Sequence, residues 1–136
     1  MKQVICAILG LGLVIFASCS SEPSYAPADN GLVAAQQFLS SCSKGDFNQA
    51  AFYVQTDSVN NAQLTKLKDA YYHNSSEQRV EYRSSNTIVL QDETVSPTEE
   101  VITYQNSYDK VTRKVKAVKT GGGWKVDLKY TFSGNL

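Results

Sequence analysis

The chain has 136 residues, of which 42% are hydrophobic and eight are tyrosines. This composition is typical of a globular protein with one modest core, and the length excludes a second one. Thirteen basic and thirteen acidic residues cancel, so no overall field favours nucleic acid as a partner. The charge is uneven along the chain, because residues 19–109 hold five basic and twelve acidic side chains whereas residues 110–136 hold seven basic and one acidic.

Residues 1–18 have the pattern of a secretory signal peptide. Lys2 precedes a mostly apolar stretch of fourteen residues, 4–17, and small residues come directly before Cys19. A helix of this length spans about 21 Å, which is shorter than the roughly 30 Å hydrocarbon core of a bilayer. We therefore expect a cleaved signal rather than a permanent membrane span.

The stretch Phe16-Ala17-Ser18-Cys19 resembles the lipobox of bacterial lipoproteins, with Phe16 where leucine is usual. The resemblance implies cleavage before Cys19, a lipid thioether on its sulfur and acylation of the new amino terminus. Cys19 then anchors the chain in the bacterial cell envelope, and Ser20 after the anchor favours the outer membrane over the inner membrane. Residues 19–30 are rich in Ser, Pro and Ala, which predicts a flexible tether before a single domain over residues 31–136.

The stretch 34–54 is expected to form two helices that meet at a glycine. Gly45 suits a left-handed helix end, and Asp46 can cap the second helix, with Gln49 completing a capping box. The apolar residues recur mainly at steps of three and four, as on one side of a helix. In the first helix they are Leu32, Ala35, Phe38, Leu39 and Cys42, and in the second they are Phe47, Ala50, Ala51 and Val54.

The three cysteines do not predict a disulfide framework. Cys6 leaves with the signal and Cys19 is lipidated, so Cys42 is left alone on an apolar helix face. If Cys19 escaped lipidation, a Cys19–Cys42 disulfide would be possible. A catalytic role for Cys42 is disfavoured, because buried thiols in core helices are usually inert.

A third helix is predicted over residues 59–72, with Asp57 or Ser58 as its cap. The only histidine, His73, follows where the helical pattern ends. A zinc site needs three or four converging ligands, which one histidine and one core cysteine do not supply, so we expect no metal site. The apolar side of this helix is expected to contain Ala62, Leu64, Leu67, Ala70 and Tyr71.

Four strands are predicted over residues 80–91, 99–108, 111–119 and 124–132, the first of them kinked at 84–86. Asp109-Lys110 and Gly121-Gly122-Gly123 mark tight turns between the last three strands. Short connections imply an antiparallel sheet with one face on the helices. In the last strand the residues that alternate on the apolar face are Trp124, Val126, Leu128, Tyr130 and Phe132.

Three parts of the chain resemble the small bacterial lipoproteins that have a nuclear-transport-factor-2-like, or cystatin-like, domain. The resemblance covers roughly residues 31–129 and implies an α+β fold, in which a curved antiparallel four-stranded sheet folds over N-terminal helices and leaves a cone-shaped cavity. Such folds host enzymes, ligand binders and scaffolds, so the fold alone does not decide the function. The residues that carry the resemblance are Phe38-Leu39, Lys44-Gly45-Asp46-Phe47, Ala50, Tyr53-Val54 and Gly122-Gly123-Trp124-Lys125-Val126-Asp127.

The function expected from these features is that of a non-enzymatic, membrane-anchored protein whose domain binds a small molecule or another protein. Cys19 is the one site residue, as the lipidation site, and no catalytic, cofactor-binding or metal-binding residue is assigned. Two alternatives stay open. One is an isomerase-like or dehydratase-like enzyme with Asp57, Tyr71, Tyr82 and Tyr104 as the candidate residues. The other is docking on an anionic surface through the basic C-terminal hairpin, with Lys114, Lys116, Lys125 and Lys129.

Overall fold

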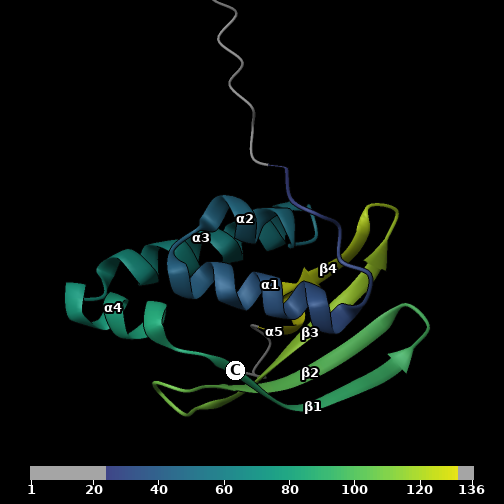
Figure 1. Ribbon diagram of the computed structural model, residues 1–136. Coiled ribbons are helices and arrows are strands. Elements are labelled where there is room, and N and C mark those ends of the chain that lie inside the picture. Colours follow the sequence, from purple (N-terminus) through teal and green to yellow (C-terminus); the bar gives the residue numbers. More distant parts are fainter. Residues whose placement is uncertain (1–23, 132–136) are drawn as a thin grey trace, which may run out of the picture.

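The computed structural model describes residues 24–131 (Figure 1). The helices α1, α2 and α3 lie on one side of a single antiparallel sheet with the strand order β1-β2-β3-β4. The predicted α+β class, with helices followed by a four-stranded antiparallel sheet, is confirmed. The elements are α1 (Gly31–Lys44), α2 (Phe47–Phe52), α3 (Ser58–His73), α4 (Ser76–Ser84), β1 (Thr87–Ser96), β2 (Glu99–Asn106), β3 (Thr112–Thr120), β4 (Gly123–Asp127) and α5 (Leu128–Thr131).

The core lies where α1 packs against β2, β3 and β4. Ala34 and Ala35 have no exposed surface, and their small side chains allow a close approach of the neighbouring elements. The predicted stripe of α1 is only partly right, since Leu32, Leu39 and Cys42 are half-buried. α1 contacts other helices as well as the sheet, so its buried surface is wider than a single apolar stripe. Its buried residues are Gly31, Ala34, Ala35, Phe38 and Ser41.

The junction between α1 and α2 forms as predicted at Gly45, whose φ of 77° is left-handed. The Asp46 carboxylate accepts a hydrogen bond from the backbone N–H of Gln49 at 3.0 Å and so caps α2. The predicted capping box is wrong, because the backbone N–H of Asp46 donates to the Ser41 carbonyl at 2.9 Å, while the Gln49 side chain donates to Gln37 at 3.4 Å. In α2 the prediction of a buried Ala51 is also wrong, since its side chain is exposed.

The segment predicted as the start of the first strand is a helix, α4, over Ser76–Ser84. Ser75 accepts from the Gln78 backbone N–H at 3.2 Å, and the Gln78 side chain accepts from the Ser75 N–H at 3.0 Å. This reciprocal capping box satisfies two N–H groups that would otherwise lack partners, and it starts a helix despite the β-favouring Val80 and Tyr82. β1 therefore begins only at Thr87.

The last strand of the structure, β4, is shorter than the alternating pattern that predicted it. β4 ends at Asp127, and the chain turns into the short helix α5 at Leu128. Trp124, Val126 and Leu128 are buried as predicted, but α5 ends the alternation before Tyr130. Phe132, the last residue of the predicted strand, lies outside the described residues.

The segment before α1 packs against the domain from residue 25 onward. Ala28 forms a bridge with Trp124, and Val54 forms a parallel bridge with Val126, so both segments pair with the outer edge of β4. The Tyr53 hydroxyl also donates to the carbonyl of Ala26 at 2.8 Å. This part of the predicted tether is therefore held in place by hydrogen bonds, while residues 19–23 lie outside the described residues.

Candidate functional site

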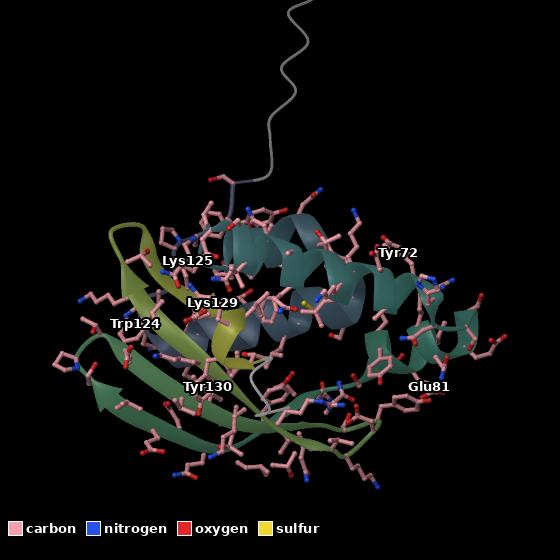
Figure 2. The ribbon with its side chains drawn as sticks, turned by 180° about the vertical axis from the view of Figure 1, so that it is seen from behind. Tyr72, Glu81, Trp124, Lys125, Lys129 and Tyr130 are labelled. Atoms are coloured by element: carbon pink, nitrogen blue, oxygen red, sulfur yellow. The ribbon has the colours of Figure 1, made fainter. Side chains whose placement is uncertain are left out.

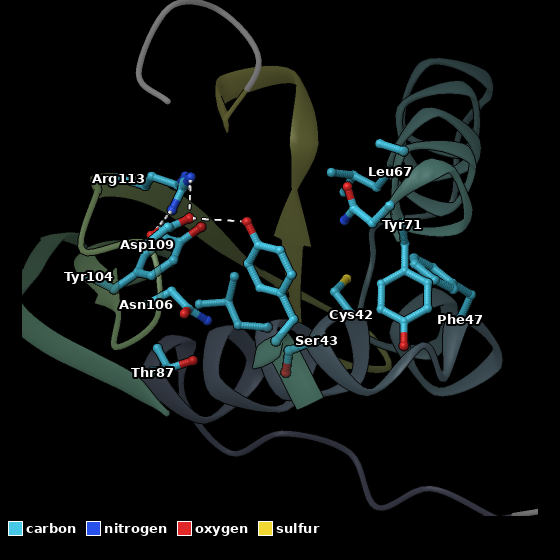
Figure 3. Close-up of a pocket in the computed structure, with 14 residues that line it drawn as sticks. Cys42, Ser43, Phe47, Leu67, Tyr71, Thr87, Tyr104, Asn106, Asp109 and Arg113 are labelled. Atoms are coloured by element: carbon cyan, nitrogen blue, oxygen red, sulfur yellow. Dashed lines mark hydrogen bonds and ion pairs between the residues drawn. The ribbon is translucent and has the colours of Figure 1, made fainter. Parts of the chain in front are cut away.

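A cavity of about 240 Å³ lies at one end of the domain. The helices that form it are α1 and α3 with their C-terminal halves, the start of α2, and α4 (Figure 3). The sheet contributes the beginnings of β1 and β3 and the end of β2 with the turn that follows. The strands run from this end toward the β3–β4 turn, where residue 28 pairs with β4. The cavity and the bridge between Ala28 and Trp124 are therefore at opposite ends of the sheet.

One side of the cavity is apolar. Leu39 from α1, Phe47 from α2 and Leu67 and Tyr71 from α3 line it. The rings of Phe47 and Tyr71 meet edge to face, with their centroids 5.7 Å apart. Two aliphatic and two aromatic side chains thus make a surface suited to a small apolar group.

The opposite side of the cavity contains an ion pair (Figure 3). Arg113 contacts both carboxylate oxygens of Asp109, with Nη2–Oδ2 at 2.7 Å and Nη1–Oδ1 at 3.0 Å. The Tyr82 hydroxyl donates to Oδ2 at 3.4 Å, and the backbone N–H of Val111 donates to Oδ1 at 3.0 Å. The carboxylate thus accepts four hydrogen bonds, which is about its full capacity.

This pair stays ionised at neutral pH. Burial disfavours the charged form of Asp109, but the hydrogen bonds from Arg113 and from the Val111 N–H outweigh it and lower the pKa of Asp109. The hydrogen bond to Asp109 also raises the pKa of Arg113, against the effect of burial. The two opposite charges cancel, so this side of the cavity is polar but has no net charge.

Tyr104 lies next to Arg113, its cross-strand partner on β3. Tyr104 lines the cavity and is only 7% exposed. Burial raises the pKa of its hydroxyl to about 12, so the group is a neutral hydrogen-bond donor at any physiological pH. Within residues 24–131 this hydroxyl makes no hydrogen bond.

The Cys42 thiol also lines the cavity, and burial raises its pKa to about 12. A thiol with such a pKa is almost entirely protonated at neutral pH and is a poor nucleophile. The pKa of Tyr82 is raised too, first by burial and then by Asp109. The pKa shifts of Cys42, Tyr82, Tyr104 and Asp109 therefore all lead away from neutrality, whereas a general acid or base works best with a pKa near the working pH.

The structure brings together three of the four candidate enzyme residues, since Tyr71, Tyr82 and Tyr104 all line the cavity. Asp57 is elsewhere, at the N-terminus of α3, where it caps the helix. The sequence interpretation missed Asp109 and Arg113, which were considered only as a turn residue and as part of a basic segment. Their spacing of four residues across a tight turn was the available signal, and it was not specific enough to place them in a cavity.

The Tyr71 hydroxyl is buried without a hydrogen-bond partner among the described residues. It lies over Gly45, where an added Cβ would be 2.9 Å from the hydroxyl oxygen. This oxygen has almost no accessible surface, so only the ring of Tyr71 contributes to the cavity wall.

The four lysines of the basic C-terminal hairpin are mostly engaged within the domain. Lys116 pairs with Glu99 at 2.8 Å, and Lys129 pairs with Asp57 at 3.0 Å. Lys125 donates to the Phe52 carbonyl, and its ammonium lies 3.8 Å from the centroid of the Phe52 ring. Figure 2 shows Lys125 and Lys129 on the same side of the molecule. Lys114 is exposed.

Neither a protein-family model nor a curated protein matches this chain. In the part of the chain that the structure describes, no helix combines the length and the apolar character needed to cross a membrane.

Proposed function

We propose that the chain is a bacterial envelope lipoprotein, anchored through Cys19, whose domain binds a small molecule in the cavity without catalysing a reaction. The observation that carries the binding role is the cavity itself, which has an apolar wall on one side and fixed polar groups on the other. This combination is typical of small-molecule sites. The anchor is supported by the apolar stretch 4–17 and by the lipobox-like residues that end at Cys19.

We further propose that the domain has the nuclear-transport-factor-2-like, or cystatin-like, cone. The order of the helices before the sheet supports this assignment, and so does the position of the cavity between the helices and one end of the sheet. The non-catalytic role is supported by the direction of the pKa shifts in the cavity, because Asp109 stays charged and Tyr104 and Cys42 stay neutral.

The place where the N-terminal segment contacts the domain determines where an anchor at Cys19 would attach relative to the cavity. The N-terminal segment joins the domain beside the β3–β4 turn, and the cavity lies at the β2–β3 end of the sheet. The segment also contacts α2, since the rings of Tyr25 and Phe52 lie 5.5 Å apart between centroids. A flexible tether before it leaves the domain free to turn, so that the cavity can face the aqueous compartment.

Native mass spectrometry of the full chain, purified gently from its own host, tests both parts of the proposal. We expect a mass that corresponds to cleavage before Cys19 with attached acyl groups, together with a bound species of constant mass. In the variant Ala70→Trp the bound species should be lost, because Ala70 lines the cavity and the indole would fill it. Ala62→Trp is the matched control, since Ala62 is an exposed alanine of the same helix away from the cavity.

The two parts can fail separately. An unprocessed N-terminus without acyl groups would contradict the anchor and leave the binding role intact. A bound species that persists in Ala70→Trp would show that it does not occupy the cavity. A processed chain that is empty in every preparation would contradict the binding role.

A further inference from the structure

We infer that the cavity selects an uncharged molecule that has a compact apolar body and a carbonyl group, with the carbonyl oxygen accepting a hydrogen bond from the Tyr104 hydroxyl. This inference rests on the proposed ligand-binding function and specifies the chemistry of its ligand. It is carried by three features of the cavity: its charge, its free donor and its size.

The charge of the cavity disfavours ionic ligands of either sign. Asp109 and Arg113 are the only charged residues among the described residues that line it, and they are paired with each other. A cationic ligand would find the Asp109 carboxylate already accepting four hydrogen bonds. An anionic ligand would have to draw Arg113 away and leave Asp109, whose side chain is 16% exposed, without its partner.

Tyr104, Asn74 and Thr87 line the cavity and make no side-chain hydrogen bond within residues 24–131. We assign the Tyr104 hydroxyl as the donor to the ligand, because Tyr104 is buried whereas Asn74 and Thr87 are half-buried. Tyr82 cannot take this role while its proton is donated to Asp109. The amide of Asn106 is held in place, because its Nδ2 donates to Ser85 at 2.7 Å and its Oδ1 accepts from the Tyr108 N–H at 2.8 Å, which leaves one N–H of the Nδ2.

Unlike the Tyr71 oxygen, the Tyr104 oxygen keeps accessible surface and is open to the cavity. A ligand oxygen that accepts from it there forms a hydrogen bond that is stronger than in water, because the surroundings are of low polarity. The high pKa of Tyr104 keeps the proton in place for this hydrogen bond.

The size of the cavity limits the apolar body. A volume of about 240 Å³ is smaller than the range of about 300–1,000 Å³ that is common for drug-sized ligands. About eight molecules of liquid water occupy the same volume. One substituted ring, placed against Leu39, Phe47 and Leu67, is the natural occupant of such a space.

Four probes of nearly equal shape separate these features. Acetophenone has an uncharged carbonyl, benzoate has a negative charge, benzylammonium has a positive charge, and ethylbenzene has neither charge nor acceptor. The full chain in lipid nanodiscs is dialysed against a fixed aqueous concentration of each probe, so that partitioning into lipid does not change the free concentration. Occupancy is read from the protection of Cys42, which lines the cavity, against a small thiosulfonate reagent, by mass spectrometry of the peptide that contains it. Because little of this thiol is ionised, its slow labelling is first measured at pH 9 in the chain without a probe, and this rate sets the exposure time.

We expect acetophenone to protect Cys42 at a concentration about tenfold lower than any of the other three probes, as one additional hydrogen bond allows. Tyr104→Phe should abolish the advantage of acetophenone over ethylbenzene without changing the protection by ethylbenzene. Tyr72→Phe is the matched control, because Tyr72 is 56% exposed and lies outside the cavity. It should leave all four concentrations unchanged.

The outcomes distinguish this inference from the proposed function. Tighter protection by benzoate or benzylammonium would overturn the uncharged class and would still support a ligand site in the cavity. An acetophenone advantage that survives in Tyr104→Phe would overturn the role of that hydroxyl. Absence of protection by all four probes would contradict small-molecule binding in this cavity altogether.

Discussion

Asn60 is a polar side chain without exposed surface that joins the start of α3 to the end of β4. Its Nδ2 donates to Asp57 at 2.7 Å and to Asp127 at 3.4 Å, and its Oδ1 accepts from the backbone N–H of Leu128 at 2.6 Å. Leu128 is where β4 gives way to α5. Asn60 therefore fixes α3 to the end of the sheet and helps to determine where the last strand stops.

We expect Asn60→Ala to lower the free energy of unfolding by about 2–3 kcal/mol, because it leaves the buried N–H of Leu128 without an acceptor and creates a small void. Asn61→Ala is the matched control, since Asn61 is exposed on the same helix, and its effect should stay within about 0.5 kcal/mol. Urea denaturation followed by circular dichroism measures both values. Equal stability of the two variants would contradict the structural role of Asn60.

At the level of the elements, the junction between α1 and α2 depends on Gly45 for two reasons. Its φ of 77° is left-handed, and a Cβ placed there would lie 2.7 Å from the ring of Tyr71. We expect Gly45→Ala to lower the free energy of unfolding by about 1–3 kcal/mol, from the left-handed strain and the clash together. Gly121→Ala should be close to neutral in the same urea denaturation, because nothing lies within 4 Å of its added Cβ. A neutral Gly45→Ala would show that α3 can move away from the junction.

The elements also show which sequence signals were sufficient. The Gly45 end of α1 and the Asp46 cap of α2 were predicted because a cap depends on residues at most four positions apart. The capping box of Ser75 and Gln78 is equally local, but the interpretation gave more weight to Val80 and Tyr82 and predicted a strand. Propensity is the weaker signal in such a conflict, because packing and caps override it.

At the scale of the whole molecule, Asp57 links stability to pH. Hydrogen bonds from the backbone and side chain of Asn60, followed by the one from Lys129, lower the pKa of Asp57 from 3.8 to about 2. A carboxylate whose pKa is lower in the folded state contributes stability above its unfolded pKa and loses it as the pH falls. This contribution is therefore complete above about pH 4 and disappears as the pH falls toward about 2.

We expect Asp57→Asn to lose less stability than the wild-type chain when the pH falls from 5 to 2, measured as the urea midpoint at each pH. Asp69→Asn is the control, because the Asp69 carboxylate makes no hydrogen bond or ion pair within residues 24–131. It should follow the wild-type curve. An Asp57→Asn curve as steep as that of the wild type would assign the acid sensitivity to other carboxylates.

Local sequence patterns were enough to predict the α+β class, the helix junction at Gly45, the two turns of the last three strands and the burial of Trp124 and Val126. These features arise from turn chemistry and periodicity within a few residues. Tertiary structure decided the end of β4, the packing of residues 25–30 on the domain and the cavity with its ion pair. The contacts responsible join residues that are far apart, such as Tyr82 and Asp109, separated by 27 positions, and Asn60 and Leu128, separated by 68. Hydrophobic periodicity tells which side of an element is buried, but it does not tell which distant element covers that side, and the cavity lies where that covering is incomplete.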